Sequence, residues 1–241
     1  MIGLSIILPF YRRAAIFERT LQRNREFFRP DYEVLVVMDD PEGVDDVLRI
    51  AAENPEVNWK IVLNELAHEW RNPAKALNVG IRQARAEVVL VGSPETVWIS
   101  DVPGLLLPKA QQEPRHIHYG EITFTDPFKI HCAADLDGKV KYSCGSMCTK
   151  KTNLEAVAGY DESLVGWGAD DDNLRARLAL SGVHGRLHKE VQLVHPPQTE
   201  KHRFYSADTA ARLLELVKPV DARANGDTWG RDFDKIILET A

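Results

Sequence analysis

The sequence predicts a single α/β domain whose central sheet is mostly parallel and carries helices on both faces. Its first hundred residues alternate between short β-branched runs and longer amphipathic stretches, which is the pattern of βαβ units. The runs at residues 4–9 and 33–38 are apolar on both faces, as expected of strands buried inside a parallel sheet. A turn signal later in the chain predicts a smaller antiparallel addition.

The first half supplies the parallel core. Strands are expected at residues 4–9, 33–38, 59–63 and 88–91. Helices are expected at 14–28, where Ile16, Phe17 and Leu21 recur at helical spacing, and at 44–52. Asn72 and Pro73 have the residue types of an N-cap and a first helical position, so a further helix begins there.

The second half breaks this alternation. Asp137 and Gly138 predict a hairpin turn between strands at 130–134 and 140–143, because this pair tolerates the positive φ that such turns require. Thr152 is a candidate cap for a short helix that ends near Gly159. Further helices are expected at 170–180, closed by Ser181 and Gly182, and at 207–217. Since no linker or internal repeat separates these parts, we expect one unit over residues 1–241.

Composition excludes several classes of protein. The chain has 241 residues, of which 44% are hydrophobic and 27% charged, so it is an ordinary globular chain. Its apolar runs are too short to span a bilayer, and no basic leader precedes the first strand, so we expect a cytoplasmic protein without a transmembrane segment. A net charge of −6 argues against nucleic acid as a partner. The 3 cysteines lack zinc-site spacing and are expected to be reduced core thiols.

Ligands of parallel sheets bind at the carboxyl ends of the strands, where loops and helix N-termini converge. The segments that follow the expected strands there are 9–13, 39–43 and 92–96, and carboxylates occur in the last two. None of them contains the glycine pattern of a dinucleotide-binding loop or of a P-loop. A ligand at this carboxylate-rich edge therefore has to be bound by groups other than a glycine-rich phosphate-binding loop.

Several motifs in this order resemble those of one family. They are Ile6–Arg12, Val36–Asp40, the segment 74–80 with Asn78, Gly159–Glu162, and Gly166–Asp172. Together they resemble the family-2 glycosyltransferases of the GT-A fold, and the last is similar to the tryptophan-glycine and acidic motif of the β-1,4-galactosyltransferase relatives. The resemblance spans residues 4 to 195.

The resemblance implies an inverting transfer of a sugar from a nucleotide-sugar, expected to be a UDP-sugar, to a hydroxyl of a saccharide or glycoconjugate acceptor. Residues 1–95 would form the nucleotide-sugar-binding half and residues 96–241 the acceptor-binding and catalytic half. Within the first half, Pro9, Tyr11 and Ser93 lie in the binding-edge segments.

A carboxylate after the second strand contacts the base and ribose in this family, which assigns that role to Asp39 or Asp40. A carboxylate can accept from a uracil N–H or a ribose hydroxyl. The alternative is a turn-forming aspartate that bonds its own backbone.

The donor diphosphate needs cations, and Arg12, Arg71 and Lys75 lie in or beside the binding-edge segments. Solvated surface cations are the alternative for each of them. Asn78 matches a donor-binding position of the family, although a capping or packing hydrogen bond explains it equally well. The segment 144–147 corresponds to the donor-sugar pocket of relatives, where packing is the simpler explanation.

The family's metal motif, Asp-x-Asp, aligns with Ser93-Pro94-Glu95, so only one carboxylate remains, with a longer reach. The resemblance implies manganese or magnesium held by Glu95, donor oxygens and one more side chain. His195, after the strand at 191–194, is the expected second ligand and His202 a weaker candidate; a surface histidine is the alternative for either.

The acidic triplet at 170–172 carries the catalytic prediction. By resemblance, Asp171 is the general base that takes the acceptor proton, and Asp170 bonds acceptor hydroxyls. Acids in a first helical turn also stabilise the helix dipole, and Asp171 could pair with Arg175. That alternative leaves Gly166, Trp167 and Gly168 unexplained, whereas a mobile aromatic loop is suited to bind an acceptor sugar.

Two other functions compete with this interpretation. A catalytically inactive sugar or nucleotide-binding module is favoured by the altered Ser93-Pro94-Glu95 segment, but such a module has no need for Asp170 and Asp171. A sugar-1-phosphate nucleotidyltransferase would share the α/β architecture, but its glycine-rich loop is missing after Leu8.

Overall fold

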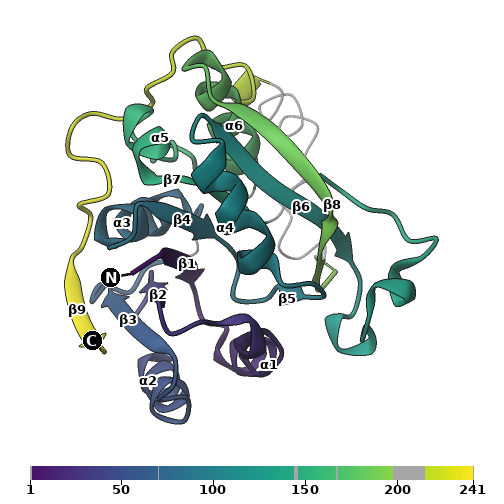
Figure 1. Ribbon diagram of the computed structural model, residues 1–241. Coiled ribbons are helices and arrows are strands. Elements are labelled where there is room, and N and C mark those ends of the chain that lie inside the picture. The colour runs from purple at the N-terminus through teal and green to yellow at the C-terminus, as the bar shows by residue number, and fades with distance from the viewer. Residues whose placement is uncertain (1, 70, 144–145, 167, 198–214, 241) are drawn as a thin grey trace.

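A computed structural model describes residues 2–69, 71–143, 146–166, 168–197 and 215–240. These residues form one mixed sheet with helices on both faces (Figure 1). The order of its strands is β5-β8-β6-β7-β4-β1-β2-β3-β9. The predicted fold class, an α/β domain with a parallel core and antiparallel additions, is confirmed.

The parallel core consists of the first four strands. They are β1 (Leu4–Phe10), β2 (Tyr32–Met38), β3 (Asn58–Leu63) and β4 (Val88–Val91). Strand β1 lies between β2 and β4, and β2 also pairs with β3, all in parallel. Because β1 is central, the loop that follows it opens at the middle of the sheet edge.

The helices between these strands match the expected ones closely. They are α1 (Ala14–Asn24), α2 (Val44–Ala52) and α3 (Ala74–Gln83). Helix α1 is shorter than predicted and continues as a 3-10 turn over Arg25–Phe27. Helix α3 begins one residue later than predicted, and the Asn72 side chain accepts from the backbone N–H of Ala74 at 3.0 Å.

The part of the sheet outside the parallel core is larger than predicted and is mixed, because β6 and β8 pair in parallel whereas the other added pairs are antiparallel. It contains β5 (Val97–Trp98), β6 (His116–Phe124), β7 (Met147–Lys150), β8 (His184–His195) and β9 (Lys235–Glu239). Strand β7 joins β6 to the parallel core, and β9 covers the far edge of β3.

The predicted hairpin at 130–143 is wrong. Gly138 has the expected positive φ of 73°, but Ala133–Leu136 form a 3-10 helix instead of a strand. Tyr142 forms an isolated bridge with Ile122 of β6, so this side of the turn pairs with an element more distant in sequence. The sequence therefore predicted the turn at Gly138 correctly, but the segment that pairs beside it is determined by the whole sheet.

The remaining helices are α4 (Val102–Gln112), which the pattern did not predict, α5 (Lys151–Ala156) and α6 (Asp170–Leu180). Helix α5 begins before Thr152, so this residue is not its cap. Helix α6 has its predicted bounds and ends at Ser181 and Gly182, whose φ is 79°. Most of the helix expected at 207–217 lies outside the described residues.

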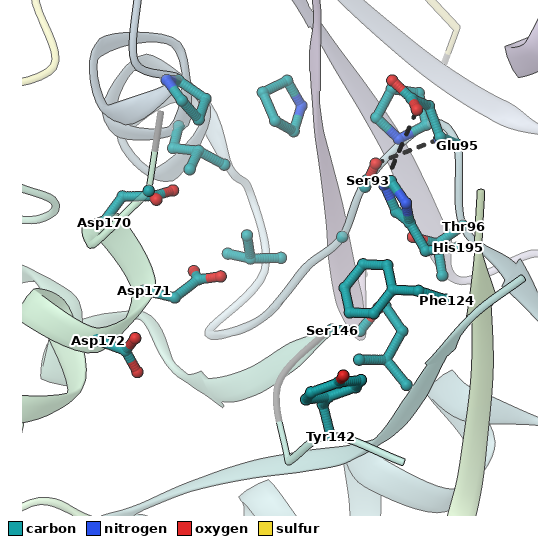
Figure 2. A pocket seen from close by; sticks show the side chains of 18 of the residues that line it. Ser93, Glu95, Thr96, Phe124, Tyr142, Ser146, Asp170, Asp171, Asp172 and His195 are labelled. Carbon is teal, nitrogen blue, oxygen red and sulfur yellow. Dashed lines mark hydrogen bonds and ion pairs between the residues drawn. The ribbon is translucent and has the colours of Figure 1, made fainter. Parts of the chain in front are cut away.

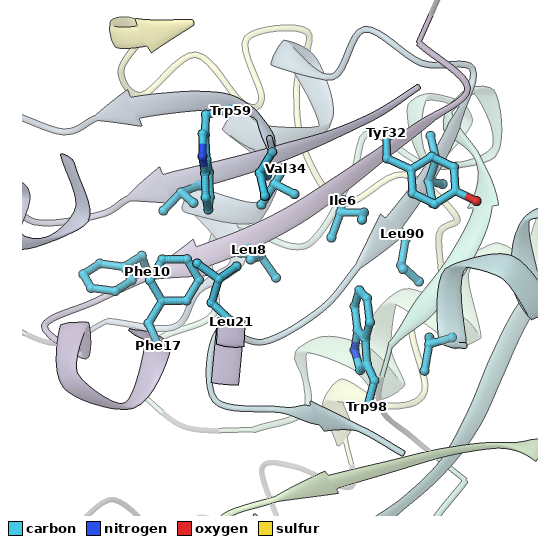
Figure 3. Close-up of a cluster of buried hydrophobic side chains, with 14 of the residues drawn as sticks. Ile6, Leu8, Phe10, Phe17, Leu21, Tyr32, Val34, Trp59, Leu90 and Trp98 are labelled. Atoms are coloured by element: carbon cyan, nitrogen blue, oxygen red, sulfur yellow. The ribbon is translucent and has the colours of Figure 1, made fainter. Parts of the chain in front are cut away.

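Two hydrophobic clusters lie on opposite faces of the sheet. Alternate side chains of β1 divide between them: Ile6 and Leu8 lie in the first cluster, which Figure 3 shows, and Ile7 lies in the second. Helices α1, α2 and α4 pack on the first face, and α3, α5 and α6 on the second. This double cover explains the apolar runs of β1 and β2, and it leaves the strand ends as the place for polar side chains.

Two further expectations concern the membrane and the cysteines. Among the described residues, no helix has the length and apolar character needed to cross a bilayer. Cys148 is buried as expected, but Cys132, which directly precedes the 3-10 helix, is exposed, and Cys144 lies outside the described residues.

Candidate active site

A cavity of about 660 Å³ opens at the carboxyl ends of β1 and β4. The loop at 92–96 forms one wall together with the last residues of β6 and β8, and the first turn of α6 forms the other. Figure 2 shows Asp170, Asp171 and Asp172 on one side and Glu95 and His195 on the opposite side. Residues that are far apart in the sequence therefore meet in one space.

The turn after β1 directs two adjacent arginines differently. Arg12 has a φ of 53°, in the left-handed region that few non-glycine residues adopt. Its guanidinium pairs with Asp40 at 2.8 Å and with Glu42 at 3.1 Å. Arg13, not Arg12, lines the cavity together with Pro9 and Tyr11. The sequence analysis named Arg12 for this turn and not Arg13, because nothing local indicates the reversal at Arg12.

Glu95 lies between two nitrogen-bearing side chains. Its Oε1 is 2.8 Å from Nη1 of Arg13, and its Oε2 is 3.9 Å from Nε2 of His195. The other ring nitrogen of His195, Nδ1, is 2.8 Å from the carbonyl oxygen of Pro196. A carbonyl only accepts, so Nδ1 carries hydrogen, and in the neutral ring the lone pair is on Nε2, toward Glu95.

This arrangement fits a divalent cation in part. A carboxylate oxygen and an imidazole lone pair on one cavity wall are suitable ligands, and a bonded Nδ1 is typical of metal-binding histidines. In the part of the chain that the structure describes, no group of three or more His, Cys, Asp or Glu side chains could hold a metal. A cation at Glu95 and His195 would therefore need further ligands from a substrate or from water.

The opposite wall is the first turn of α6. Ala169 precedes it in a left-handed conformation, with φ of 67°, and all three acids of the turn line the cavity. Removal from bulk solvent and the neighbouring Asp171 raise the pKa of Asp170 to about 7. Desolvation inside the cavity also raises the pKa of Asp171, although the residue keeps an exposed surface and Arg175 opposes the shift.

The sequence analysis did not name two aromatic residues of the cavity, and it named Arg175 only as a possible partner of Asp171. Phe124 and Tyr142 lie edge to face, with ring centroids 5.4 Å apart. Arg175 pairs with Asp172 and donates to the carbonyl oxygen of Ser143 at 2.8 Å. The isolated bridge that holds Tyr142 and the position of Ser143 are both tertiary contacts, so no local signal could have indicated them.

Asp39 and Asp40 do not line the cavity. They are 4% and 1% exposed, and Asp39 pairs with Arg71. Burial alone would raise the pKa of Asp40, but hydrogen bonds from Arg12 and from the backbone N–H groups of Glu42 and His68 lower it overall. The Oδ1 atom of Asp40 accepts from Glu42 N at 2.8 Å, which is the turn-forming alternative.

Two predicted phosphate ligands and one predicted donor contact also lie elsewhere. Arg71 and Lys75 each pair with Asp232 at 3.0 Å, and neither lines the cavity. Asn78 is completely buried; its amide donates to Tyr160 O at 2.8 Å and accepts from Tyr160 N at 2.7 Å. We therefore correct Asn78 to a packing residue that holds the start of the 160–164 loop.

The predicted acceptor loop is only partly described. Gly166 and Gly168 have φ values of 81° and 89°, so a side chain at either position would be strained. Gly168 lines the cavity, and Gly166 O accepts from the Asn72 side chain at 3.1 Å. Trp167, the pair at 144–145 and His202 lie outside the described residues.

The open α/β sheet with a carboxylate-lined cavity at its strand ends agrees with the GT-A fold that the sequence resemblance implies. The sequence profile described as "Glycosyl transferase family 2" matches residues 5–133, which is more than half of the chain. The profile described as "N-terminal domain of galactosyltransferase" matches residues 130–206. The chain therefore belongs to glycosyl transferase family 2. No curated protein sequence matches it.

Several solved structures have a similar fold. A mannosyltransferase from Pyrobaculum calidifontis, solved with GDP-Man and Mn²⁺, has a TM-score of 0.61 at 20% identity; the match covers 83% of this chain and 58% of that one. The catalytic domain of Drosophila β1,4-galactosyltransferase 7, solved with xylobiose, has a TM-score of 0.54 at 14% identity, with 90% and 80% covered. GalNAc-T7, solved with UDP, GalNAc and Mn²⁺, has a TM-score of 0.64 at 11% identity, with 89% and 48% covered.

Proposed function

We propose that the protein is an inverting glycosyltransferase that moves a sugar from a nucleotide-sugar to a hydroxyl of a saccharide or glycoconjugate. One observation carries this proposal: Asp170 and Asp171 face Glu95 and His195 across a single cavity of about 660 Å³. A base for the acceptor on one wall and ligands for a donor diphosphate on the other are what a direct displacement needs.

Asp171 is the proposed base. The acceptor oxygen forms a bond to the anomeric carbon while the bond from that carbon to the diphosphate oxygen breaks, and the acceptor proton passes to the Asp171 carboxylate. A raised pKa makes this carboxylate a better proton acceptor than an ordinary aspartate. Asp170, beside it, accepts hydrogen bonds from acceptor hydroxyls while it is ionised.

The charges of the cavity favour a divalent cation. Glu95 and the acids at 170–172 face only two guanidinium groups, those of Arg13 and Arg175, among the described lining residues. A donor diphosphate adds further negative charge to a region that is already acidic. We propose that manganese or magnesium is held by Glu95 and His195, where it would stabilise the charge that develops on the departing diphosphate.

Calorimetric titration with UDP, GDP and CDP, each with and without Mn²⁺, tests the donor site. We propose UDP as the nucleotide and expect it to bind with Mn²⁺. Glu95→Ala should weaken this binding by about tenfold or more, because a charged ligand is lost. Glu56→Ala is the matched control, since Glu56 pairs at 4.0 Å with Arg25 away from the cavity.

Each outcome separates the candidate functions. Metal-dependent binding that disappears only in Glu95→Ala would support the donor site and justify a screen of donor sugars. If none of the three nucleotides binds the wild-type protein under either condition, the proposal fails and the inactive binding module becomes the better explanation.

A further inference from the structure

Tyr160 is a buried side chain that the proposed mechanism does not use. It is completely buried, in the hydrophobic cluster on the face of the sheet that α6 covers. Its hydroxyl nevertheless reaches a residue of the cavity, because it donates to Oδ1 of Asp171 at 3.4 Å. A phenol from the core thus contacts the carboxylate that is proposed as the base.

The backbone of Tyr160 is held from two directions. Ala158 and Gly159 follow helix α5 in left-handed conformations, with φ of 58° and 69°, and turn the chain so that Tyr160 enters the core. The Asn78 amide bonds both the N–H and the carbonyl oxygen of Tyr160, and the Asn225 amide donates to the same oxygen at 2.5 Å. The ring is therefore fixed in place, and its hydroxyl stays beside the first turn of α6.

The chemistry of the two groups sets the direction of this hydrogen bond. Burial raises the pKa of Tyr160 well above that of an ordinary tyrosine, and the charge of Asp171 raises it further, so the hydroxyl keeps its hydrogen. An ionised carboxylate can only accept. The distance of 3.4 Å is long for an O–H···O bond, as is common for catalytic hydrogen bonds before substrate binds. The contact therefore favours the ionised form of Asp171.

Other charged and titratable groups around Asp171 act in both directions. Desolvation raises the pKa of Asp171, Arg175 lowers it, Asp172 raises it, and the Tyr160 hydroxyl lowers it. Asp170 is adjacent in the chain, and the ring centroid of Tyr119 in β6 lies 5.5 Å from the Arg175 guanidinium. Arg175 is paired with Asp172, whereas Tyr160 is hydrogen-bonded to Asp171 itself.

We propose that Tyr160 is a positioning residue for the base: its hydroxyl orients the Asp171 carboxylate and keeps it ionised until it takes the acceptor proton. The phenol holds Oδ1, which leaves Oδ2 for the acceptor hydroxyl. Tyr160 itself contacts no reacting atom and acts only through Asp171. This inference rests on the proposed function, because Asp171 is the proposed base.

A pH titration of the Asp171 carboxyl carbon tests this role without turnover. Nuclear magnetic resonance of protein with isotope-labelled aspartate follows the signal, which is identified by its absence from Asp171→Asn. Tyr160→Phe removes the hydroxyl and keeps the ring. In this variant Asp171 should bind its proton about threefold to tenfold more tightly than in wild type, because a hydrogen bond to the charged form is lost.

Turnover gives a second readout of the same variant. With a donor found by the nucleotide screen, kcat of Tyr160→Phe should fall by about threefold at pH 8, because the carboxylate is less well oriented. At pH 6 the loss should reach about tenfold or more, because a larger fraction of Asp171 is protonated in the variant. KM for the donor should stay the same, since Tyr160 does not line the cavity.

Tyr32→Phe is the matched control. Tyr32 is 1% exposed and lies in the cluster on the opposite face of the sheet. Its hydroxyl has no hydrogen-bond partner in the part of the chain that the structure describes. The same substitution at this position should change neither the titration of Asp171 nor kcat.

The outcomes separate this inference from the proposed function. An Asp171 titration that is the same in Tyr160→Phe and wild type would overturn the inference, even if kcat or the unfolding temperature fell, because a packing role alone does not move that titration. Nucleotide binding and a large loss of kcat in Asp171→Asn would then leave the proposed function intact. A wild-type protein that binds none of the nucleotides would remove the proposed function and this inference with it.

Discussion

The two walls of the cavity use carboxylates in different surroundings. On one wall Glu95 is 2.8 Å from the Arg13 guanidinium and faces His195. On the other wall Asp170, Asp171 and Asp172 follow one another in a single helical turn, with Arg175 bonded to the last of them. One wall places a carboxylate among cations, and the other places carboxylates beside each other.

This difference separates two chemical tasks. A carboxylate oxygen beside an imidazole nitrogen is suited to bind metal, and an adjacent guanidinium is suited to bind a diphosphate. Carboxylates crowded together on one cavity wall hold protons more readily, and desolvation there together with a neighbouring carboxylate raises the pKa values of both Asp170 and Asp171. The Glu95 wall is therefore suited to bind the donor diphosphate, and the α6 wall is suited to accept a proton, as the proposed reaction requires.

The largest expected effect comes from removing the proposed base on the α6 wall. Asp171→Asn should lower kcat by about a hundredfold or more, because an amide cannot take the acceptor proton, while nucleotide affinity stays the same. The kcat is measured with a donor found by the nucleotide screen, and the nucleotide affinity is measured by calorimetry.

Asp172→Asn is the matched control for that variant. Asp172 lies in the same turn, but its side chain is 60% exposed and pairs with Arg175. We expect its kcat to fall by less than about tenfold. Equal losses in the two variants would contradict the assignment of the base to Asp171.

A middle-sized effect should appear in the pH dependence. Since the pKa of Asp170 is raised to about 7, the folded chain keeps a proton that the unfolded chain releases near pH 4. Its contribution to stability is therefore present at low pH and lost as the pH rises through about 7. Turnover should change in the opposite direction, and fall as the pH drops below this value.

Asp170→Asn removes this titration. At pH 8 the variant should unfold about 2–4 °C above wild type, which corresponds to a gain of about 1 kcal/mol, and this advantage should disappear at pH 5. Thermal unfolding followed by circular dichroism at the two pH values measures the difference. A variant that is less stable than wild type at pH 8 would show that the ionised Asp170 carboxylate does not destabilise the folded chain.

The smallest expected effect is a pH dependence of stability that arises outside the cavity, from a pair of histidines. It serves as a comparison for the pH dependence of the α6 wall. His118 is completely buried, and its Nδ1 is 3.0 Å from Nε2 of His188. Burial lowers the pKa of both rings; the charged side chains around them are Glu113, Lys109, Glu190 and Arg186, with His116 adjacent. Because the unfolded chain takes up these protons more readily, stability should fall as the pH drops below about 6.5.

His188→Gln should reduce this loss of stability between pH 7 and pH 5 by about 2 °C in the unfolding temperature, and leave turnover at pH 7 unchanged. His188 lies in β8, outside the cavity-lining residues, so the variant separates the two pH responses. If turnover followed the His188 substitution, the α6 wall would not be the source of the pH profile.

Much of the fold could be read from local patterns. The doubly apolar runs of β1 and β2 predicted their place between two layers of helices, because a strand with both faces buried has no polar side. Helix α2 and helix α6 have the predicted bounds, since the apolar spacing and the following Asn54-Pro55 turn of α2, and the Ser181-Gly182 end of α6, are all local signals. The hairpin at 130–143 failed because a turn signal does not specify the strand's partner.

In the candidate site, too, some features follow from the sequence alone and others only from the tertiary structure. Sequence alone decided which residue types follow each strand and that three acids begin α6, because chain order and helical geometry are local properties. Tertiary structure decided that Arg13 rather than Arg12 enters the cavity, that Asp39 and Asp40 are paired internally, and that His195 lies beside Glu95. Ion pairs depend on distance through space, and a distance between residues a hundred positions apart exists only once the sheet has formed.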